Sequence, residues 1–287
     1  MLLSRRLFLS CSLITVLLSA CGSTGSKTQK RLTIGIVSYG EGQQSLEQFE
    51  DLKVHLEGSL KSLIEIEPAF NERQAIQQIE RQSWDIVFAP PGLAAIAISQ
   101  EQYIPLLPRE GGIKGQSVIV VLDNSPAKSL KDLANQPLAL GQEGSATGYY
   151  LPVFNLYGLT LSKVTLAPTP KAVLQFLEEG KAAAGALSVA EFEQYRSDFS
   201  STKFRILFRD SHTVPAGSVL VGPTVERNFQ KEIQSALEAA GSPVAASAGY
   251  ITNAAPPDYS YLIKVVKQVR PIAKRIKETP APLYEQK

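Results

Sequence analysis

The chain has 287 residues, of which 44% are hydrophobic and 20% are charged, and it contains 20 Gly, 18 Pro and 2 Cys. This composition is ordinary for a folded globular protein and excludes a disordered polyampholyte, a collagen, a coiled coil and a disulfide-stapled miniprotein. The 29 basic and 27 acidic residues nearly cancel. A nucleic-acid binder usually shows a strong basic excess, so we expect no nucleic-acid partner.

The first 20 residues have the pattern of a signal peptide. Arg5 and Arg6 precede an apolar run at residues 7–18, and small residues then lead to Cys21. The run is too short for a membrane span, which favours a cleaved signal over a transmembrane anchor. The sequence LSAC at residues 18–21 resembles a bacterial lipobox. It implies that Cys21 carries a lipid, which anchors a periplasmic or cell-envelope protein to the membrane.

The basic pair leaves two export routes open. SRRLFL at residues 4–9 resembles the twin-arginine motif, but two ordinary charges before a Sec signal would look the same. After cleavage Cys11 is lost and Cys21 is lipidated, so the folded part has no thiol for a disulfide, a metal site or a nucleophile. Residues 21–30 are predicted to be the lipidated, flexible tether, because they are rich in Ser, Thr, Gly and Lys.

Strand and helix patterns alternate from residue 31 onward. Strands are predicted at residues 31–40, 63–68, 84–90, 103–107 and 117–122, and helices at residues 45–58, 72–82 and 93–98. The run SVIVVL at residues 117–122 is continuous and rich in β-branched residues, which is typical of a buried strand. This alternation predicts an α/β fold with mainly parallel sheets.

The alternation restarts near residue 123 and returns near residue 215. Strands are predicted at residues 137–141, 163–167, 183–188, 204–209 and 219–224, and helices at residues 129–135, 145–157, 170–179, 189–195, 226–240 and 258–277. We therefore expect one lobe from residues 31–122 and 215–287, and a second, inserted lobe from residues 123–214. A ligand cleft would lie between such lobes.

The segment QEGSATGYYLP at residues 142–152 follows a predicted strand and opens a helix. The first N–H groups of a helix have no internal partners and lie at the positive end of its dipole, so an anion can accept hydrogen bonds from them. Ser145 and Thr147 add hydroxyl donors, and Gly148 lets a ligand approach the backbone. Pro152 fits an early helical turn. From these residues alone, an anion site and a plain helix cap are both open.

Further stretches occur in an order that is known from one family. They are LTIGIVSYG at residues 32–40, WDIVFAPPG at residues 84–92, the run from SVIVVL to SATG at residues 117–148, and GKAAAGALS at residues 180–188. Together they resemble the phosphonate-binding family of periplasmic solute-binding proteins. The resemblance implies a two-lobe periplasmic binding protein of type II with a ligand cleft between the lobes. It also implies an ABC permease as partner, a small phosphorus oxyanion (phosphonate, phosphite or phosphate) as ligand, and neither catalysis nor a cofactor.

The resemblance assigns binding roles to four places in the chain. They are the oxyanion-binding turn, an aromatic residue after the first strand, the loop across the cleft, and the residue before a helix of the second lobe. The candidate ligand-binding residues are Tyr39, Pro91, Gly92, Ser145, Ala146, Thr147, Gly148 and Thr169.

Three positions depart from the family's pattern. Thr169 stands where the family often has a histidine, Ala183 replaces an acidic residue, and Leu93 replaces an aromatic residue. The missing groups would bind the oxyanion and any amino group of the ligand. Their absence favours phosphite, methylphosphonate or phosphate over a 2-aminoalkylphosphonate.

Other motifs carry less chemistry. GEGQQS at residues 40–45 lacks the last glycine of a dinucleotide-binding fingerprint, so a polar turn is expected there. DSHT at residues 210–213 suggests a nucleophile–base pair, but neighbours in sequence seldom point together, and we expect a loop beside the hinge. No metal site is expected. Two alternatives stay open: a ligand sensor or scavenger on the same fold, and an exported serine hydrolase with Ser145 or Ser211 as nucleophile.

Overall fold

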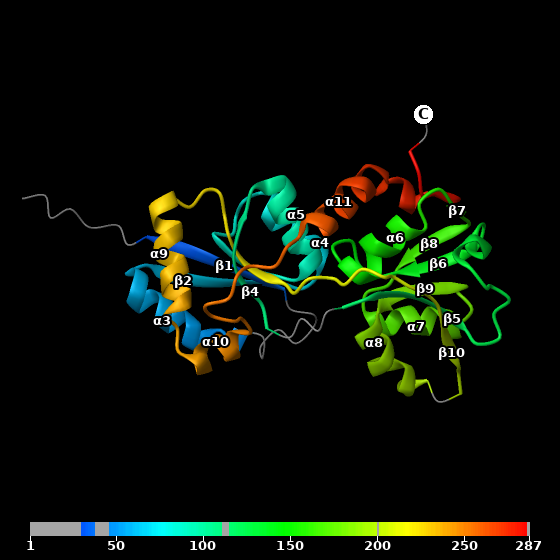
Figure 1. Ribbon diagram of the computed structural model, residues 1–287, viewed down its shortest axis with the longest axis horizontal. Helices are drawn as coiled ribbons and strands as arrows, with labels where there is room; N and C mark the ends of the chain where they lie inside the picture. Colours follow the sequence, from blue (N-terminus) through cyan, green and yellow to red (C-terminus); the bar gives the residue numbers. More distant parts are fainter. Residues whose placement is uncertain (1–29, 38–45, 111–114, 200, 286–287) are drawn as a thin grey trace, which may run out of the picture. The chain divides into compact units, whose positions relative to one another are not determined.

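The strands form two five-stranded sheets in the computed structural model of the chain (Figure 1). The structure describes residues 30–37, 46–110, 115–199 and 201–285. The predicted signal peptide, the tether with Cys21, the candidate Tyr39 and the turn at residues 40–45 lie outside the described residues. The contacts of the chain join Arg31–Lys287 into one unit.

The first sheet has the strand order β2-β1-β3-β11-β4. Its strands are β1 (Arg31–Val37), β2 (Leu63–Ala69), β3 (Ile86–Ala89), β4 (Ile104–Pro108) and β11 (Ser218–Val221). β1 pairs in parallel with β2 and β3, whereas β11 pairs antiparallel with β3 and β4. β11 is therefore the one strand of this sheet that runs against the others.

Helices cover both faces of the first sheet, and β3 shows how the two cores are divided. Its side chains alternate, so that Ile86 and Phe88 enter one core while Val87 and Ala89 enter the other. The first core is shared with α3 (Glu50–Leu60), α9 (Arg227–Glu238) and α10 (Ser242–Ala248), and the second with α4 (Glu72–Glu80) and α5 (Pro91–Glu101). α10 was not predicted from the sequence.

The second sheet has the strand order β10-β5-β9-β6-β8. Its strands are β5 (Ser117–Leu122), β6 (Pro137–Leu140), β8 (Lys163–Leu166), β9 (Ala184–Ser188) and β10 (Phe204–Arg209). β6 pairs in parallel with β8 and β9, whereas β5 pairs antiparallel with β9 and β10. The helical elements here are η1 (Leu130–Leu133), η2 (Ala146–Tyr150), α6 (Leu151–Asn155), α7 (Pro170–Glu178), α8 (Val189–Tyr195) and η3 (Arg196–Asp198).

The reversed strand of each sheet is the one through which the chain enters from the other sheet. β5 follows β4, and β11 follows β10. The predicted α/β class with two mainly parallel, mixed sheets is confirmed. β5, which the predicted boundary at residue 122 assigns to the first lobe, belongs to the second sheet. Its apolar run indicates burial, but the sheet it joins is decided by pairing with β9 and β10, which lie far along the chain.

The C-terminal residues leave the first sheet as well. α11 (Ser260–Val269) packs against both α5 and α6, and the 3-10 turns η4 (Arg270–Ile272) and η5 (Arg275–Lys277) follow it. The final strand β12 (Ala281–Pro282), which was expected in the first lobe with the rest of residues 215–287, pairs with β7 (Thr160–Leu161). Within the described parts of the chain, no helix is long and apolar enough to cross a membrane.

Candidate functional site

A cavity of about 510 Å³ lies where loops from both sheets meet. Its wall is formed by the turn before α5, the loop and turn after β6, and the starts of α7 and α8. Among the residues that line it are the sequence-predicted candidates Pro91, Gly92, Ser145, Ala146, Thr147, Gly148 and Thr169. The structure thus brings together every candidate that it describes.

Helix starts dominate the cavity wall. α5, the continuous η2–α6 segment and α7 all begin there. Pro91 and Pro170 occupy the first position of α5 and α7, where a missing N–H costs nothing. The next backbone N–H groups of each helix have no intrahelical acceptor and carry the positive end of the dipole. The wall therefore offers partial positive charge without a cationic side chain.

The turn at Ser145 is a π-helical turn rather than the α-helix predicted. The Tyr150 N–H donates to the Ser145 carbonyl oxygen at 3.0 Å, which is five residues back. Pro152 explains part of this geometry, because it has no N–H to offer the Gly148 carbonyl oxygen. That oxygen instead accepts a hydrogen bond from the Gly141 N–H at 2.8 Å. Pro152 thereby helps to hold the turn against the end of β6.

Ser145 caps this turn. Its Oγ accepts a hydrogen bond from the Gly148 N–H at 3.0 Å, as an N-cap serine does. The bond occupies a lone pair of the hydroxyl and leaves its hydrogen to be donated. The N–H groups of Ala146 and Thr147 lie between cap and Gly148, at the positions that lack helical partners. An oxyanion at this turn can accept from two backbone groups and the neighbouring hydroxyls.

Two glycines allow this loop to lie against the starts of α4 and α5. A Cβ atom on Gly92 would lie 1.9 Å from the Gly144 carbonyl oxygen and 2.8 Å from the Ala146 nitrogen. Gly144 has φ +120°, and a Cβ there would lie 2.6 Å from the Cβ of Glu72. No other residue type fits at either position without displacing backbone. Gly92 was predicted as a binding residue, but the structure also gives it this steric reason.

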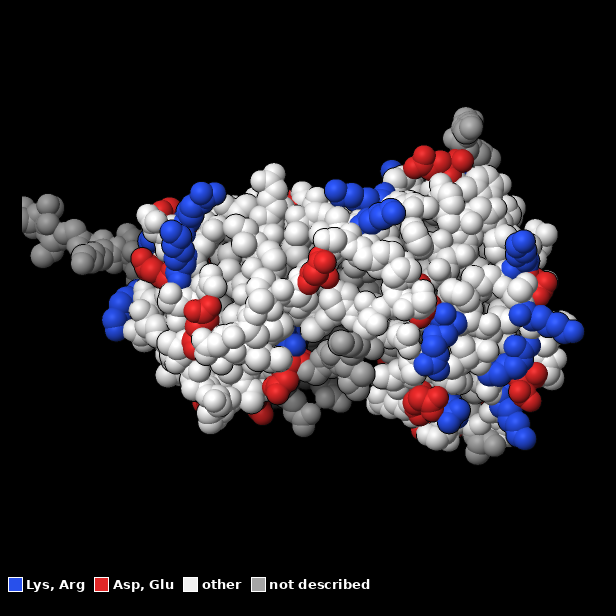
Figure 2. Space-filling view, viewed as in Figure 1, with Lys and Arg blue, Asp and Glu red and all other residues white. Residues whose placement is uncertain are grey.

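The charged side chains of the wall are carboxylates. Glu72 is only 6% exposed, and Glu191 forms a capping box in which its Oε2 accepts from the Ser188 N–H at 2.7 Å. No lysine or arginine lines the cavity in the described part of the chain. Elsewhere, charges of both signs are interspersed on the face drawn in Figure 2. An anion in this cavity is therefore stabilised by backbone dipoles and meets carboxylates at the wall.

Two buried tyrosines of η2 stay neutral behind the turn. Burial, and next the negative charge of Glu143, raises the pKa of both Tyr149 and Tyr150 above the usual phenol range. Their rings meet edge to face with centroids 5.2 Å apart. The turn thus rests on an apolar support that does not change charge at physiological pH.

Most wall residues were not predicted as ligand-binding residues, and among them are Glu72, Ser188, Glu191 and Tyr195. The Ser-x-x-Glu spacing of Ser188 and Glu191 is a capping-box signature and could have located the start of α8. The place of Glu72 beside Gly144 depends on a contact between segments far apart in sequence, which no local pattern encodes.

Neither of the described histidines forms a hydrogen bond with Ser145, one of the two candidate nucleophiles. The His55 Nε2 pairs with the Ala236 carbonyl oxygen, and the His212 Nδ1 pairs with Asp210. Asp210 and His212 do point together, at 3.0 Å, contrary to the expectation for near neighbours. No group of three or more acidic, His or Cys side chains that could hold a metal occurs within the described ranges.

Comparisons with known proteins agree with this arrangement. The model of a family described as "ABC transporter, phosphonate, periplasmic substrate-binding protein" matches residues 34–261. No curated protein sequence matches the chain.

Solved structures share the fold at low identity. XAC2383 from Xanthomonas citri, bound to chloride, is 22% identical over 83% of this chain and 95% of its own, with a TM-score of 0.66. PhnD1 from Prochlorococcus marinus (MIT 9301), in complex with methylphosphonate, is 18% identical over 84% of this chain and 98% of its own, with a TM-score of 0.63. A phosphonate transporter binding protein from Pseudomonas aeruginosa is 12% identical over 86% and 88%, with a TM-score of 0.61.

Proposed function

Because the chain belongs to the periplasmic substrate-binding proteins of phosphonate ABC transporters, we propose that it captures a small phosphorus oxyanion for such a transporter. In this proposal a lipid on Cys21 anchors the protein at the outer side of the membrane, and the ABC permease is its partner. The observation that carries the proposal is the convergence of helix starts on the cavity that contains Ser145–Gly148.

The oxyanion is held by the N–H groups of Ala146 and Thr147 and by the hydroxyls of Ser145 and Thr147. The starts of α5 and α7 face it from the rest of the wall. Gly92 follows a strand of one sheet and the turn follows a strand of the other, so we propose two lobes that correspond to the two sheets. The lobes close on the ligand by hinge motion where the chain passes between the sheets, from β4 to β5 and from β10 to β11.

A ligand that carries a proton fits this cavity better than a fully ionised one. Glu72 and Glu191 are the charged side chains at the described wall, and a carboxylate oxygen there can accept a hydrogen bond from a ligand that carries an O–H group. Monoprotonated phosphite, phosphate and phosphonate have an O–H to donate. A sulfonate has none near neutral pH. The carboxylates therefore favour phosphorus over sulfur oxyanions.

A thermal-shift panel tests the proposed function. Phosphite, phosphate, methylphosphonate, 2-aminoethylphosphonate, sulfate and methanesulfonate are each added to the purified protein. A ligand at about 100 times its dissociation constant stabilises the folded state by roughly 2.7 kcal/mol, which raises Tm by about 5–10 °C in a chain of this size. We expect a shift with at least one of the first three. An unchanged Tm with every phosphorus compound would overturn the proposal.

Glu72→Gln tests selection by protonation. The second ionisation of a phosphate ester lies at about pH 6, and above it the proton-bearing monoanion becomes scarce. We expect the wild-type Kd for methylphosphonate or phosphite, whose dianions carry no O–H, to rise with pH through the second ionisation of that ligand. Glu72→Gln should flatten this dependence and improve methanesulfonate binding about tenfold. Glu65→Gln on the exposed side of β2 is the control. An unaltered pH profile in Glu72→Gln would reject this role.

A further inference from the structure

The segment that begins the proposed anion site is held at both ends through contacts of one buried residue, Asp210. Asp210 lies where the chain passes from β10 of the second sheet to β11 of the first. The segment comprises the cap Ser145, η2 and α6, residues 145–155, and is called the anion-binding segment below. We infer that Ser117 and Asp210 are positioning residues for the ligand: they touch no ligand, yet they set its affinity by fixing this segment. The inference rests on the proposed function and adds how the anion-binding segment is held in position.

Ser117 holds the near end. Its Oγ donates to the Thr147 carbonyl oxygen at 2.6 Å, and the residue is only 2% exposed. The Gly148 N–H of the same peptide group donates to Ser145 Oγ. This peptide is therefore fixed at both of its polar atoms, once by the cap and once by β5. Rotation of the peptide would turn the Ser145 hydroxyl and the adjacent Thr147 N–H away from an oxyanion.

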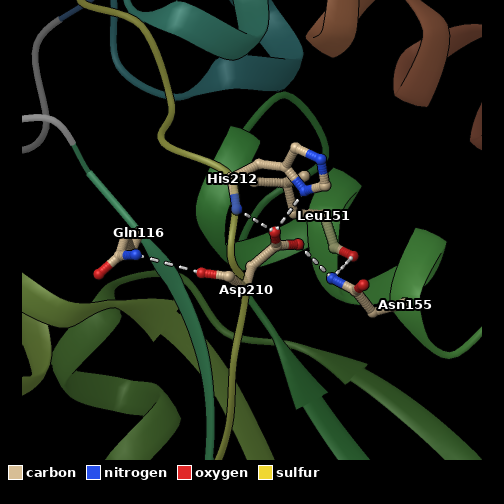
Figure 3. A network of polar contacts seen from close by, with 5 residues as sticks. All are labelled: Gln116, Leu151, Asn155, Asp210 and His212. Atoms are coloured by element: carbon tan, nitrogen blue, oxygen red, sulfur yellow. Dashed lines mark hydrogen bonds and ion pairs between the residues drawn. The ribbon is translucent and has the colours of Figure 1, made fainter.

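Asp210 holds the far end, as Figure 3 shows. The Asn155 Nδ2, at the end of α6, donates to Asp210 Oδ2 at 2.5 Å and to the Leu151 carbonyl oxygen at 2.9 Å. The other carboxylate oxygen, Oδ1, accepts from the His212 N–H at 2.8 Å and pairs with its Nδ1 at 3.0 Å. The Asp210 side chain is 2% exposed, so these contacts are shielded from water.

The two ends meet in the backbone of Asp210. Its N–H donates to the Ser117 carbonyl oxygen at 2.9 Å. Its carbonyl oxygen accepts from Gln116 Nε2 at 3.3 Å, as Figure 3 shows. Asp210 thus connects Ser117, which holds the Thr147 carbonyl group, with Asn155, the last residue of α6. The anion-binding segment is braced at both ends against the point where the chain leaves β10 for β11.

The crossover is itself fastened to α11. The His212 ring stacks on the Tyr261 ring with centroids 3.8 Å apart and planes 14° apart, and the Tyr259 hydroxyl donates to the Ala216 carbonyl oxygen at 2.5 Å. α11 also packs against α5, whose start forms another part of the cavity wall. The series of contacts that runs from Thr147 through Ser117 and Asp210 therefore extends through α11 to α5, which forms another part of the wall.

Ser117→Ala is the direct test, and Ser218→Ala is its matched control. Ser218 is also fully buried, and its Oγ donates to a strand carbonyl oxygen, that of Leu107, at 2.9 Å. Ser218 Oγ also lies 3.3 Å from the Val219 carbonyl oxygen. Each variant loses one buried hydroxyl bonded to a strand or turn carbonyl oxygen, so we expect similar falls in Tm. Calorimetry with methylphosphonate should show a Kd about tenfold higher in Ser117→Ala and nearly unchanged in Ser218→Ala. Equal Kd changes in the two variants would overturn the inference.

A charge swap tests the far end. Asp210→Asn places an amide opposite the Asn155 amide and should weaken binding. The double variant Asp210→Asn with Asn155→Asp restores a donor and an acceptor to the pair and should recover affinity. Recovery of Tm without recovery of Kd would mean that Asp210 is only structural.

A readout without ligand separates this inference from the proposed function. Hydrogen exchange of the amides at residues 146–151 should speed up in Ser117→Ala but not in Ser218→Ala. If no oxyanion binds the wild type, the proposed function fails, while faster exchange still supports the bracing of the turn. Unchanged exchange in Ser117→Ala would reject that bracing even if oxyanions bind.

Discussion

Gly92→Ala should abolish oxyanion binding while leaving a folded protein. The new Cβ would lie 1.9 Å from the Gly144 carbonyl oxygen. The backbone fixes the position of the Cβ, and the oxygen is itself a backbone atom, so no side-chain rotation relieves the clash. The loop at residues 141–146 and the start of α5 must separate, which displaces the Ala146 N–H from its place. Displacement of a binding group by about 1 Å at a preorganised site weakens the interaction on the order of 100-fold. We therefore expect calorimetry to show a Kd that is higher by at least this factor.

Gly58→Ala provides the control for this change. Gly58 lies inside α3, where an added Cβ meets nothing within 4 Å. Alanine there should raise the free energy of unfolding by about 0.5–1 kcal/mol, because it has the higher helix propensity, and should leave Kd unaltered. Wild-type affinity in Gly92→Ala would show that this contact is dispensable for binding.

Ser145→Ala is expected to have the second largest effect. It removes the acceptor of the Gly148 N–H, which should lower the free energy of unfolding by about 1 kcal/mol. It also removes a hydroxyl donor to the anion. A hydrogen bond to a charged group contributes about 1.5–3 kcal/mol, so Kd should rise roughly 10- to 100-fold in calorimetry.

Ser129→Ala separates the two consequences. Ser129 belongs to the capping box before η1, with its Oγ 3.1 Å from Asp132 Oδ2, and lies outside the cavity wall. The Ser129→Ala variant should have a lower free energy of unfolding than the wild type but the same Kd. If Ser145→Ala instead kept full affinity and abolished an ester hydrolysis that the wild type performs, the serine hydrolase alternative would replace the binding proposal.

Local chemistry accounts for what could be predicted about the site. The turn at residues 142–152 is recognisable because strand, glycine, cap serine and early proline are neighbours in sequence, and each has a local conformational reason. The same holds for Thr169, which caps α7 by accepting from the Ala172 N–H at 3.2 Å. These signals identify where a helix starts, and helix starts form this wall.

Non-local contacts account for what could not be predicted. The sheet that β5 joins depends on partners at β9 and β10, and the wall position of Glu72 depends on Gly144, some 70 residues later. The Asp210 contacts with Ser117 and Asn155 join three segments whose residue types carry no signature at those spacings. Residue patterns specify local backbone, whereas these contacts follow from how the sheets assemble.

In the proposed function, backbone N–H groups take the role of a cationic side chain along the described part of the wall. A buried arginine would have to be desolvated, whereas the N–H groups of a helix start are already fixed and aimed by the fold. In the proposed function, the dipoles of α5, η2–α6 and α7 attract the anion, and the carboxylate of Glu72 or Glu191 accepts a hydrogen bond from its remaining proton.

Amide chemical shifts on titration with methylphosphonate test the central claim most directly. In ¹⁵N-labelled protein, a ligand held by the turn should move the amide proton resonances of Ala146 and Thr147 downfield in a saturable way, because both N–H groups gain a charged acceptor. Resonances on the far side of the first sheet, such as that of Gly58, should not move. Saturable shifts that spare Ala146 and Thr147 would place the ligand elsewhere and contradict the account.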